Sequence, residues 1–162
     1  MDSNEAQQLL ASGADGVTEW NRRRANAQNL PPLQFVLWAP SDELRLDLRG
    51  VDLGGCKLAG SQLSSADLTG AHLFRADLSG VQLWGAKLAG ANLAEADLSG
   101  ADLTNASLEN ADLREAVLKN AHGSARFGRA RLDRADLTDS TLDNSDFGGA
   151  SLVDANLAGV SL

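Results

Sequence analysis

The chain has 162 residues, which is enough for one domain or for one domain with a small appendage. A single cysteine, Cys56, excludes a disulfide-stapled secreted domain, and no apolar run approaches the ~20 residues of a transmembrane helix. The formal net charge is -8 and the polar start of the chain is no signal peptide, so we expect a cytoplasmic protein that binds neither nucleic acid nor membranes directly.

Residues 1–45 contain two predicted helices. The first covers about Asn4–Ala11, with Ser3 as its N-cap and Gly13 just beyond its end. The second covers about Gly16–Ala27, and the helical period gathers three of its side chains on one side: Val17, Trp20 and Arg24.

From Leu46 onward the chain divides into groups of five residues. There are 22 complete quintets, of which the third residue is Leu in 20 and Phe in 2, and the first residue is Ala in 15. The first and third positions lie on one side of an extended segment, whereas positions two, four and five are mostly polar residues or Gly. A period of five matches neither an α-helix nor a long strand, and it predicts a very short strand followed by a corner. Gly recurs at position five, where a turn accommodates positive φ.

These quintets resemble the pentapeptide-repeat family, whose motif is A-(D/N)-L-x-x, over Leu46 to Leu162, which is 117 of 162 residues. The resemblance implies an all-β fold, a right-handed quadrilateral β-helix with four quintets, or 20 residues, in each coil. The repeat region then makes about six coils, since 117/20 is close to six. The resemblance also implies a protein that is not an enzyme in most cases.

Residues 1–45 are interpreted as a helical N-terminal cap and lead-in to the 46–162 solenoid. The stretch L-L-A-S-G…W-N-R-R-R…L-P-P-L resembles the cap of some bacterial members of the family. An open β-helix end exposes unpaired backbone and an apolar column, which needs a cover. Five large apolar residues are expected to provide it: Trp20, Phe35, Val36, Leu37 and Trp38.

Residue pairs 20 apart support this coil length. Phe127 and Phe147 are expected to stack in one inward column. Residues of like charge also occur 20 apart. Five pairs of opposite charge recur at this spacing: Lys57 with Asp77, Asp67 with Lys87, Arg75 with Glu95, Arg126 with Asp146, and Arg134 with Asp154.

The repeat is interrupted once, at residues 121–124, where a quintet has lost its Leu. If the coil absorbs the loss, partners across the break are 19 apart. This spacing gives opposite charges: Asp112 with Arg131, Arg114 with Asp133, and Glu115 with Arg134. We therefore predict one continuous solenoid with a pinched corner at His122–Ser124.

Catalytic residues are not expected. His72 and His122 fall on different faces without a second ligand at metal spacing, and Cys56 occupies an inward position where a small core residue is expected. Without a nucleophile and base in a cleft, we predict neither an enzyme nor a bound cofactor or metal.

Several outward residues are candidates for partner binding. Phe74 and Trp84 occupy position four of quintets on opposite faces, and Trp84 is the best single contact candidate. A basic cluster is either a patch for an acidic partner or phosphate, or a cross-coil charge ladder, and its acidic neighbours favour the ladder: Arg126, Arg129, Arg131 and Arg134. The acidic tail is either a docking surface or a solvated face: Asp136, Asp139, Asp143, Asp146 and Asp154.

The sequence stops within a quintet, without a second cap. Either the chain is truncated, or the last coil packs on another molecule, which predicts a two-fold homodimer through four apolar residues: Leu152, Leu157, Val160 and Leu162.

The functional prediction is a non-catalytic scaffold or protein-interaction module with an unidentified partner. The alternative comes from the family resemblance: a DNA mimic that binds DNA gyrase or topoisomerase IV and protects against their inhibitors. Six coils at a spacing of ~4.8 Å would form a rod ~29 Å long, and a DNA duplex of that length carries roughly 17 negative charges. The repeat instead carries 16 acidic and 10 basic residues, which weakens the DNA-mimic alternative.

Overall fold

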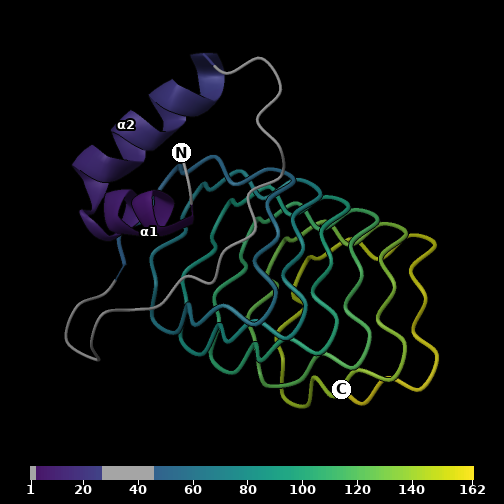
Figure 1. Ribbon diagram of the computed structural model, residues 1–162. Helices are drawn as coiled ribbons and strands as arrows, with labels where there is room; N and C mark the ends of the chain where they lie inside the picture. The colour runs from purple at the N-terminus through teal and green to yellow at the C-terminus, as the bar shows by residue number, and fades with distance from the viewer. Residues whose placement is uncertain (1–2, 27–45) are drawn as a thin grey trace.

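The computed structural model describes residues 3–26 and 46–162, and the expected roles of Phe35, Val36, Leu37 and Trp38 lie outside these residues. Figure 1 shows two helices, α1 (Ser3–Ala11) and α2 (Ala14–Asn26), at one end of a stack of coils that runs to the C-terminus at the other end. The helices begin one and two residues earlier than predicted, so Ser3 is the first helical residue and not the N-cap.

The coils are joined by four columns of parallel bridges between residues in position two of the quintets. We number the faces of the solenoid by these columns: face 1 begins at Asp47, face 2 at Asp52, face 3 at Lys57 and face 4 at Gln62. The first column contains six bridged residues, so the expected six coils are present.

The expected short strands are reduced to single bridged residues throughout residues 46–162. Each quintet turns at positions four and five, and the N–H of the next quintet closes a β-turn, as in the 3.1 Å bond from Val51 N to Leu48 O. Position five has φ between 55° and 72° in every quintet, including those without Gly. These corners leave too few extended residues for longer strands; the right-handedness of the coil stays a prediction.

The preference for Asp or Asn at position two has a local cause. Their side-chain oxygens accept a hydrogen bond from the backbone N–H two residues later, as in the 3.1 Å bond from Ser79 N to Asp77 Oδ1 and the 2.9 Å bond from Ser99 N to Asp97 Oδ1. This Asx arrangement satisfies a corner N–H that has no backbone partner in the neighbouring coil within the described residues.

The axis of the solenoid is filled by positions one and three. The Leu residues of position three are buried from Leu48 to Leu142, and Cys56 is buried at position one, as expected. The rings of Phe127 and Phe147 stack with centroids 4.7 Å apart and planes 10° apart, which confirms the predicted column.

The solenoid continues through the interruption. Bridges are 20 residues apart up to Asp102 and His122, then 19 apart for four rungs, of which Asp112 and Arg131 is one. Gly123 has φ 107°, and a Cβ there would lie 2.5 Å from Thr104 N, so the shortened corner presses against the preceding coil. The predicted pinched corner and the 19-residue spacing are confirmed.

Helix α2 covers the first coil on face 2 and satisfies its backbone groups. Trp20 is fully buried and its Nε1 donates a 2.6 Å hydrogen bond to Asp52 O. Asn21 donates to Gly50 O at 2.9 Å and accepts from Asp52 N at 2.8 Å, and Arg24 donates to Gly54 O at 2.7 Å. These bonds attach α2 to the backbone of the first coil, and the role of residues 1–45 as a cap stays a prediction.

A close crossing holds α1 against α2. A Cβ at Gly16 would lie 1.8 Å from Leu9 O, so no other residue fits without moving the helices. Arg23 bridges the two helices by pairing with Glu5 and Glu19, each at 2.7 Å. The guanidinium groups of Arg22 and Arg23 lower the pKa of Glu19 to about 2.

Candidate protein-interaction face

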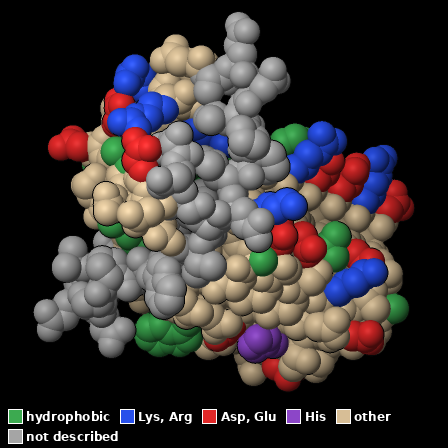
Figure 2. Space-filling model, in the orientation of Figure 1, with side chains coloured by type: hydrophobic (Ala, Val, Ile, Leu, Met, Phe, Trp, Pro, Cys, Tyr) green, Lys and Arg blue, Asp and Glu red, His purple; other side chains and the backbone are tan. Residues whose placement is uncertain are grey.

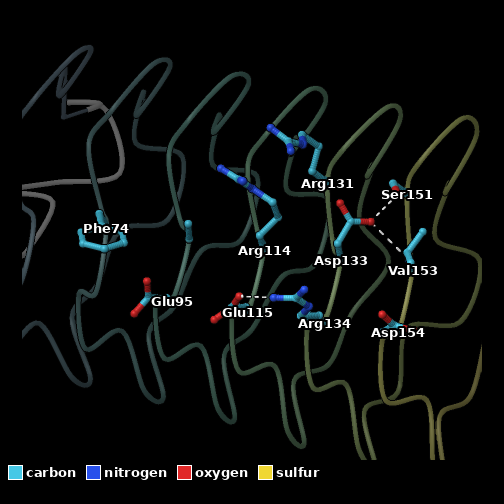
Figure 3. A pocket seen from close by; sticks show the side chains of 11 residues that line it. Phe74, Glu95, Arg114, Glu115, Arg131, Asp133, Arg134, Ser151, Val153 and Asp154 are labelled. Atoms are coloured by element: carbon cyan, nitrogen blue, oxygen red, sulfur yellow. Dashed lines mark hydrogen bonds and ion pairs between the residues drawn. The ribbon is translucent and has the colours of Figure 1, made fainter.

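The most distinctive surface of the described residues is a groove of about 510 Å³ along face 2 (Figure 3). It crosses five successive coils, and every residue that lines it comes from positions two, four or five of a face 2 quintet: Phe74, Ala94, Glu95, Arg114, Glu115, Arg131, Asp133, Arg134, Ser151, Val153 and Asp154. The 19- and 20-residue spacing alone brings these side chains together.

A second hollow, of about 360 Å³, lies between face 2 and α2. It is lined by Asn21 of the helix and by residues of the first two coils, and Phe74 lines both hollows. The small residues Gly54 and Ala94 occupy position four on either side of Phe74, so the ring forms a ridge between two depressions.

Face 2 carries both basic and acidic side chains, and several of them form ion pairs between neighbouring coils. Arg75 Nε lies 2.7 Å from Glu95 Oε2, and Arg134 Nη1 lies 3.1 Å from Glu115 Oε1 in the next pair of coils. Arg75 also lies over the Phe74 ring, 4.8 Å from its centroid, which holds the aromatic side chain against the coil.

The centre of the groove is held by a pair within one quintet. Arg114 binds both carboxylate oxygens of Asp112, at 2.7 and 2.5 Å. This hydrogen bonding lowers the pKa of Asp112, so its carboxylate stays charged at neutral pH. Arg131 lies farther from the same carboxylate, at 4.0 Å, and Asp133 accepts hydrogen bonds from Ser151 Oγ and Val153 N.

The structure divides the predicted basic cluster between two faces. Arg131 and Arg134 line the groove together with Phe74, whereas Arg126 and Arg129 lie on face 1. The ladder interpretation holds for Arg134 and, at a longer distance, Arg131; Arg129 has no ion pair within the described residues. Arg126 binds Glu109 at 2.6 Å instead of Asp146, whose carboxylate accepts a hydrogen bond from the N–H of Gly148.

The other predicted pairs are also mixed. Lys87 and Asp67 pair at 3.6 Å, and Arg75 and Glu95 pair as expected. Three of the predicted pairs form no ion pair within the described residues, so these expectations were wrong: Lys57 with Asp77, Arg134 with Asp154, and Arg114 with Asp133. In each case a nearer partner competes, such as Ser79 for Asp77 and Asp112 for Arg114.

The acidic tail does not form one surface. Asp136 and Asp139 lie on face 3, and Asp143 lies on face 4, while Asp146 and Asp154 lie on faces 1 and 2. Asp136 is also paired with Lys119 at 3.1 Å. The carboxylates of the tail are therefore distributed around the coil.

Trp84 and Phe74 point outward on opposite faces, as predicted. Trp84, on face 4, is 51% exposed, and Phe74, on face 2, is 38% exposed. Trp84 does not line the groove; its face carries only two charged residues, Asp102 and Asp143. Of the two aromatic candidates, Phe74 lines both of the hollows described above and Trp84 lines neither.

The predicted dimer end is placed in the last coil. Leu157 and Leu162 are 43% and 65% exposed, whereas Leu152 and Val160 are partly buried against the core. The homodimer through these four residues stays a prediction.

Sequence reasoning missed most of the groove. Ala94, Arg114, Glu115, Asp133 and Val153 each look ordinary within their own quintets. Reading every fourth quintet together, with the 19-residue step at the break, would have aligned them with Phe74 and revealed the exposed apolar residue at each end.

Among residues 3–26 and 46–162, no group of three or more His, Cys, Asp or Glu side chains is arranged to hold a metal ion. Neither helix of this part of the chain has the length and apolar character needed to cross a membrane. Figure 2 shows basic and acidic side chains interspersed over the visible surface of the coils.

Comparison with protein families identifies the repeat. The family model "Pentapeptide repeats (8 copies)" matches residues 47–85, 82–120 and 124–162, which is more than half of the chain. The chain belongs to the pentapeptide-repeat family. The matched segments of this pentapeptide-repeat protein stop and resume at the pinched corner.

Three solved structures illustrate the similarity, and the first two are described as pentapeptide repeat proteins. The protein Rfr23 from the cyanobacterium Cyanothece 51142 is 30% identical, with 62% of this chain and 63% of that chain covered and a TM-score of 0.36. A thylakoid lumen protein of Arabidopsis thaliana is 35% identical, with 57% and 68% covered and a TM-score of 0.35. QnrB1, a plasmid-mediated fluoroquinolone resistance protein, is 19% identical, with 78% and 75% covered and a TM-score of 0.38. Comparison with curated proteins gave no match.

Proposed function

We propose that this pentapeptide-repeat protein is a non-catalytic interaction scaffold whose face 2 contacts a protein partner. The observation that carries the proposal is the groove between Phe74 and Val153. The inward positions of the quintets account for folding, so these outward residues are free to vary for recognition. The groove offers an exposed apolar side chain at each end, 38% exposed for Phe74 and 62% for Val153, with charged groups between them.

This composition suits a protein surface. Apolar contacts provide burial, while charged groups of both signs select orientation and partner. Three arginines line the groove, and arginine and aromatic residues are enriched where interfaces bind most strongly: Arg114, Arg131 and Arg134.

The DNA-mimic alternative is not favoured by this charge arrangement. A duplex presents phosphates alone, whereas face 2 pairs Arg75 with Glu95 and Arg134 with Glu115. Gyrase supercoiling in the presence of a quinolone checks this point: we expect no effect of the protein at micromolar concentration.

The proposal is tested by affinity capture from a lysate of the source organism. We expect Phe74→Ala to lose the captured partner and Trp84→Ala, the matched change on the opposite face, to retain it. Both residues are exposed, so circular dichroism of the two variants is expected to match the wild type. A partner that is retained by Phe74→Ala and lost by Trp84→Ala would place the interaction on face 4 instead.

A further inference from the structure

The charges of face 2 are arranged antisymmetrically about its central coil. The central coil carries Asp112, Arg114 and Glu115. In position five, one coil away from the centre, Glu95 stands on one side and Arg134 on the other. Two coils away, Arg75 stands on one side and Asp154 on the other.

The apolar residues of the groove follow the same arrangement. Phe74 and Val153 are both in position four, and each lies two coils from the centre, which is about 10 Å along the axis at the ~4.8 Å spacing of neighbouring strands. A surface with these properties is complementary to itself when it is turned end over end.

We propose that a second copy of this chain docks on face 2 in an antiparallel, two-fold arrangement centred on the coil of Arg114. This inference rests on the proposed function, because it names the partner of the same face. The two-fold axis lies across the coils, so position five of one copy meets position five of the other. Arg75 then opposes the partner's Asp154, Glu95 opposes the partner's Arg134, and Phe74 opposes the partner's Val153.

The central coil meets its own copy at the axis. There Arg114 opposes the partner's Arg114 and Glu115 opposes the partner's Glu115. Each of these charges is already paired within its own copy, Arg114 with Asp112 and Glu115 with Arg134. Asp154 has no ion pair within the described residues, so the partner's Arg75 supplies a charge partner that one copy alone does not provide.

Other registers of the same two faces are repulsive. A parallel arrangement would place Arg131 opposite the partner's Arg134 and Asp112 opposite the partner's Glu115. Shifting the antiparallel arrangement by one coil places Arg75 opposite the partner's Arg134, or Glu95 opposite the partner's Asp154. Because like charges across an interface disfavour association, the charges select the register centred on Arg114.

The interface is small, so a weak and concentration-dependent dimer is expected. One face of a six-coil solenoid offers less than the ~800 Å² per partner of a standard interface, and small interfaces are typical of transient complexes. We therefore expect a dissociation constant of roughly 10–500 µM.

Sedimentation equilibrium of the full chain up to about 500 µM tests the proposal. Arg75→Glu and Asp154→Arg each place like charges opposite one another twice in a homodimer, so we expect each variant alone to weaken association at least ~10-fold. An equimolar mixture of the two variants restores opposite charges at both contacts, so we expect the heterodimer to recover. Asp139→Arg on face 3 is the control with the same change of charge as Asp154→Arg, and it should sediment as the wild type.

Three results would overturn the proposal: a monomeric wild type at 500 µM, a dimer that Arg75→Glu leaves intact, or a mixture that fails to recover. The second result includes an end-to-end dimer through the last coil. If either variant fails to fold, Glu95→Arg and Arg134→Glu provide a second pair for the same mixing experiment. A monomeric protein that still loses a captured partner on Phe74→Ala would refute the dimer and leave the interaction scaffold standing.

Discussion

Replacing Trp20 by Ala tests whether α2 stabilises the solenoid by capping its first coil. Trp20 is fully buried, and removing such a ring costs about 3–5 kcal/mol of unfolding free energy. Part of that cost, about 1–3 kcal/mol, arises because Asp52 O loses the 2.6 Å hydrogen bond from Nε1. For a chain of 162 residues, this corresponds to a fall of about 6–20 °C in melting temperature.

Two further substitutions divide this effect. Trp20→Phe retains most of the apolar contact and loses the hydrogen bond, so we expect a loss of about 1–3 kcal/mol. Trp84→Ala is the matched control, because that side chain is 51% exposed, and a change below about 0.5 kcal/mol is expected. Urea unfolding followed by circular dichroism measures all three variants.

Hydrogen exchange locates the loss. Coils of a solenoid contact only their neighbours, so losing the cap should first speed exchange in the first coils, for example at Leu53 N, which donates to His72 O. A Trp20→Ala protein within 1 kcal/mol of the wild type, or one whose exchange rises uniformly, would refute the capping account.

Other predictions concern the helix crossing, the core and acid stability. Gly16→Ala should lower the melting temperature in calorimetry despite the higher helix propensity of Ala, because its Cβ would lie 1.8 Å from a backbone oxygen; an unchanged or raised temperature would contradict the close crossing. Phe127→Leu, although Leu is the usual residue, should cost about 1 kcal/mol or more in urea unfolding because the ring stack is lost; equal stability would contradict this. Hydrogen bonds from Arg49, Arg114 and Thr138 lower the pKa values of Asp47, Asp112 and Asp136, respectively. The contribution of these three carboxylates to folding stability should therefore be complete above about pH 4–5 and lost as pH falls through their pKa values in the folded protein. Melting temperatures that rise on acidification would contradict this prediction.

The solenoid was predictable from sequence because its inward positions repeat. Burial of Leu and Ala along the axis requires every quintet to keep the same register, so the break near Gly123 could be inferred from spacing and charge. The coil length of 20 residues came from the family resemblance, and the spacing of charges only supported it. The helices were predictable from end signals, such as Gly13 with its φ of 74° after α1.

The candidate site was less predictable because outward side chains choose among several partners. Asp112 binds Arg114 within its own quintet more closely than Arg131 in the next coil, at 2.5 and 4.0 Å. An ion pair within one quintet requires a shorter segment of chain to be ordered than an ion pair between coils. The spacing of residues in the sequence alone does not tell which of the two pairs forms. The groove also depends on the small size of Ala94 beside Phe74, which a search for reactive residues overlooks.

Site-specific photo-cross-linking tests the central claim, that the protein acts through face 2. A benzophenone amino acid replaces Phe74 in one variant and Trp84 in another, and both are expressed in the source organism. We expect protein adducts from the Phe74 position, including an adduct with a second copy of this chain, and none from the Trp84 position. Adducts only from the Trp84 position, or from neither, would contradict the account.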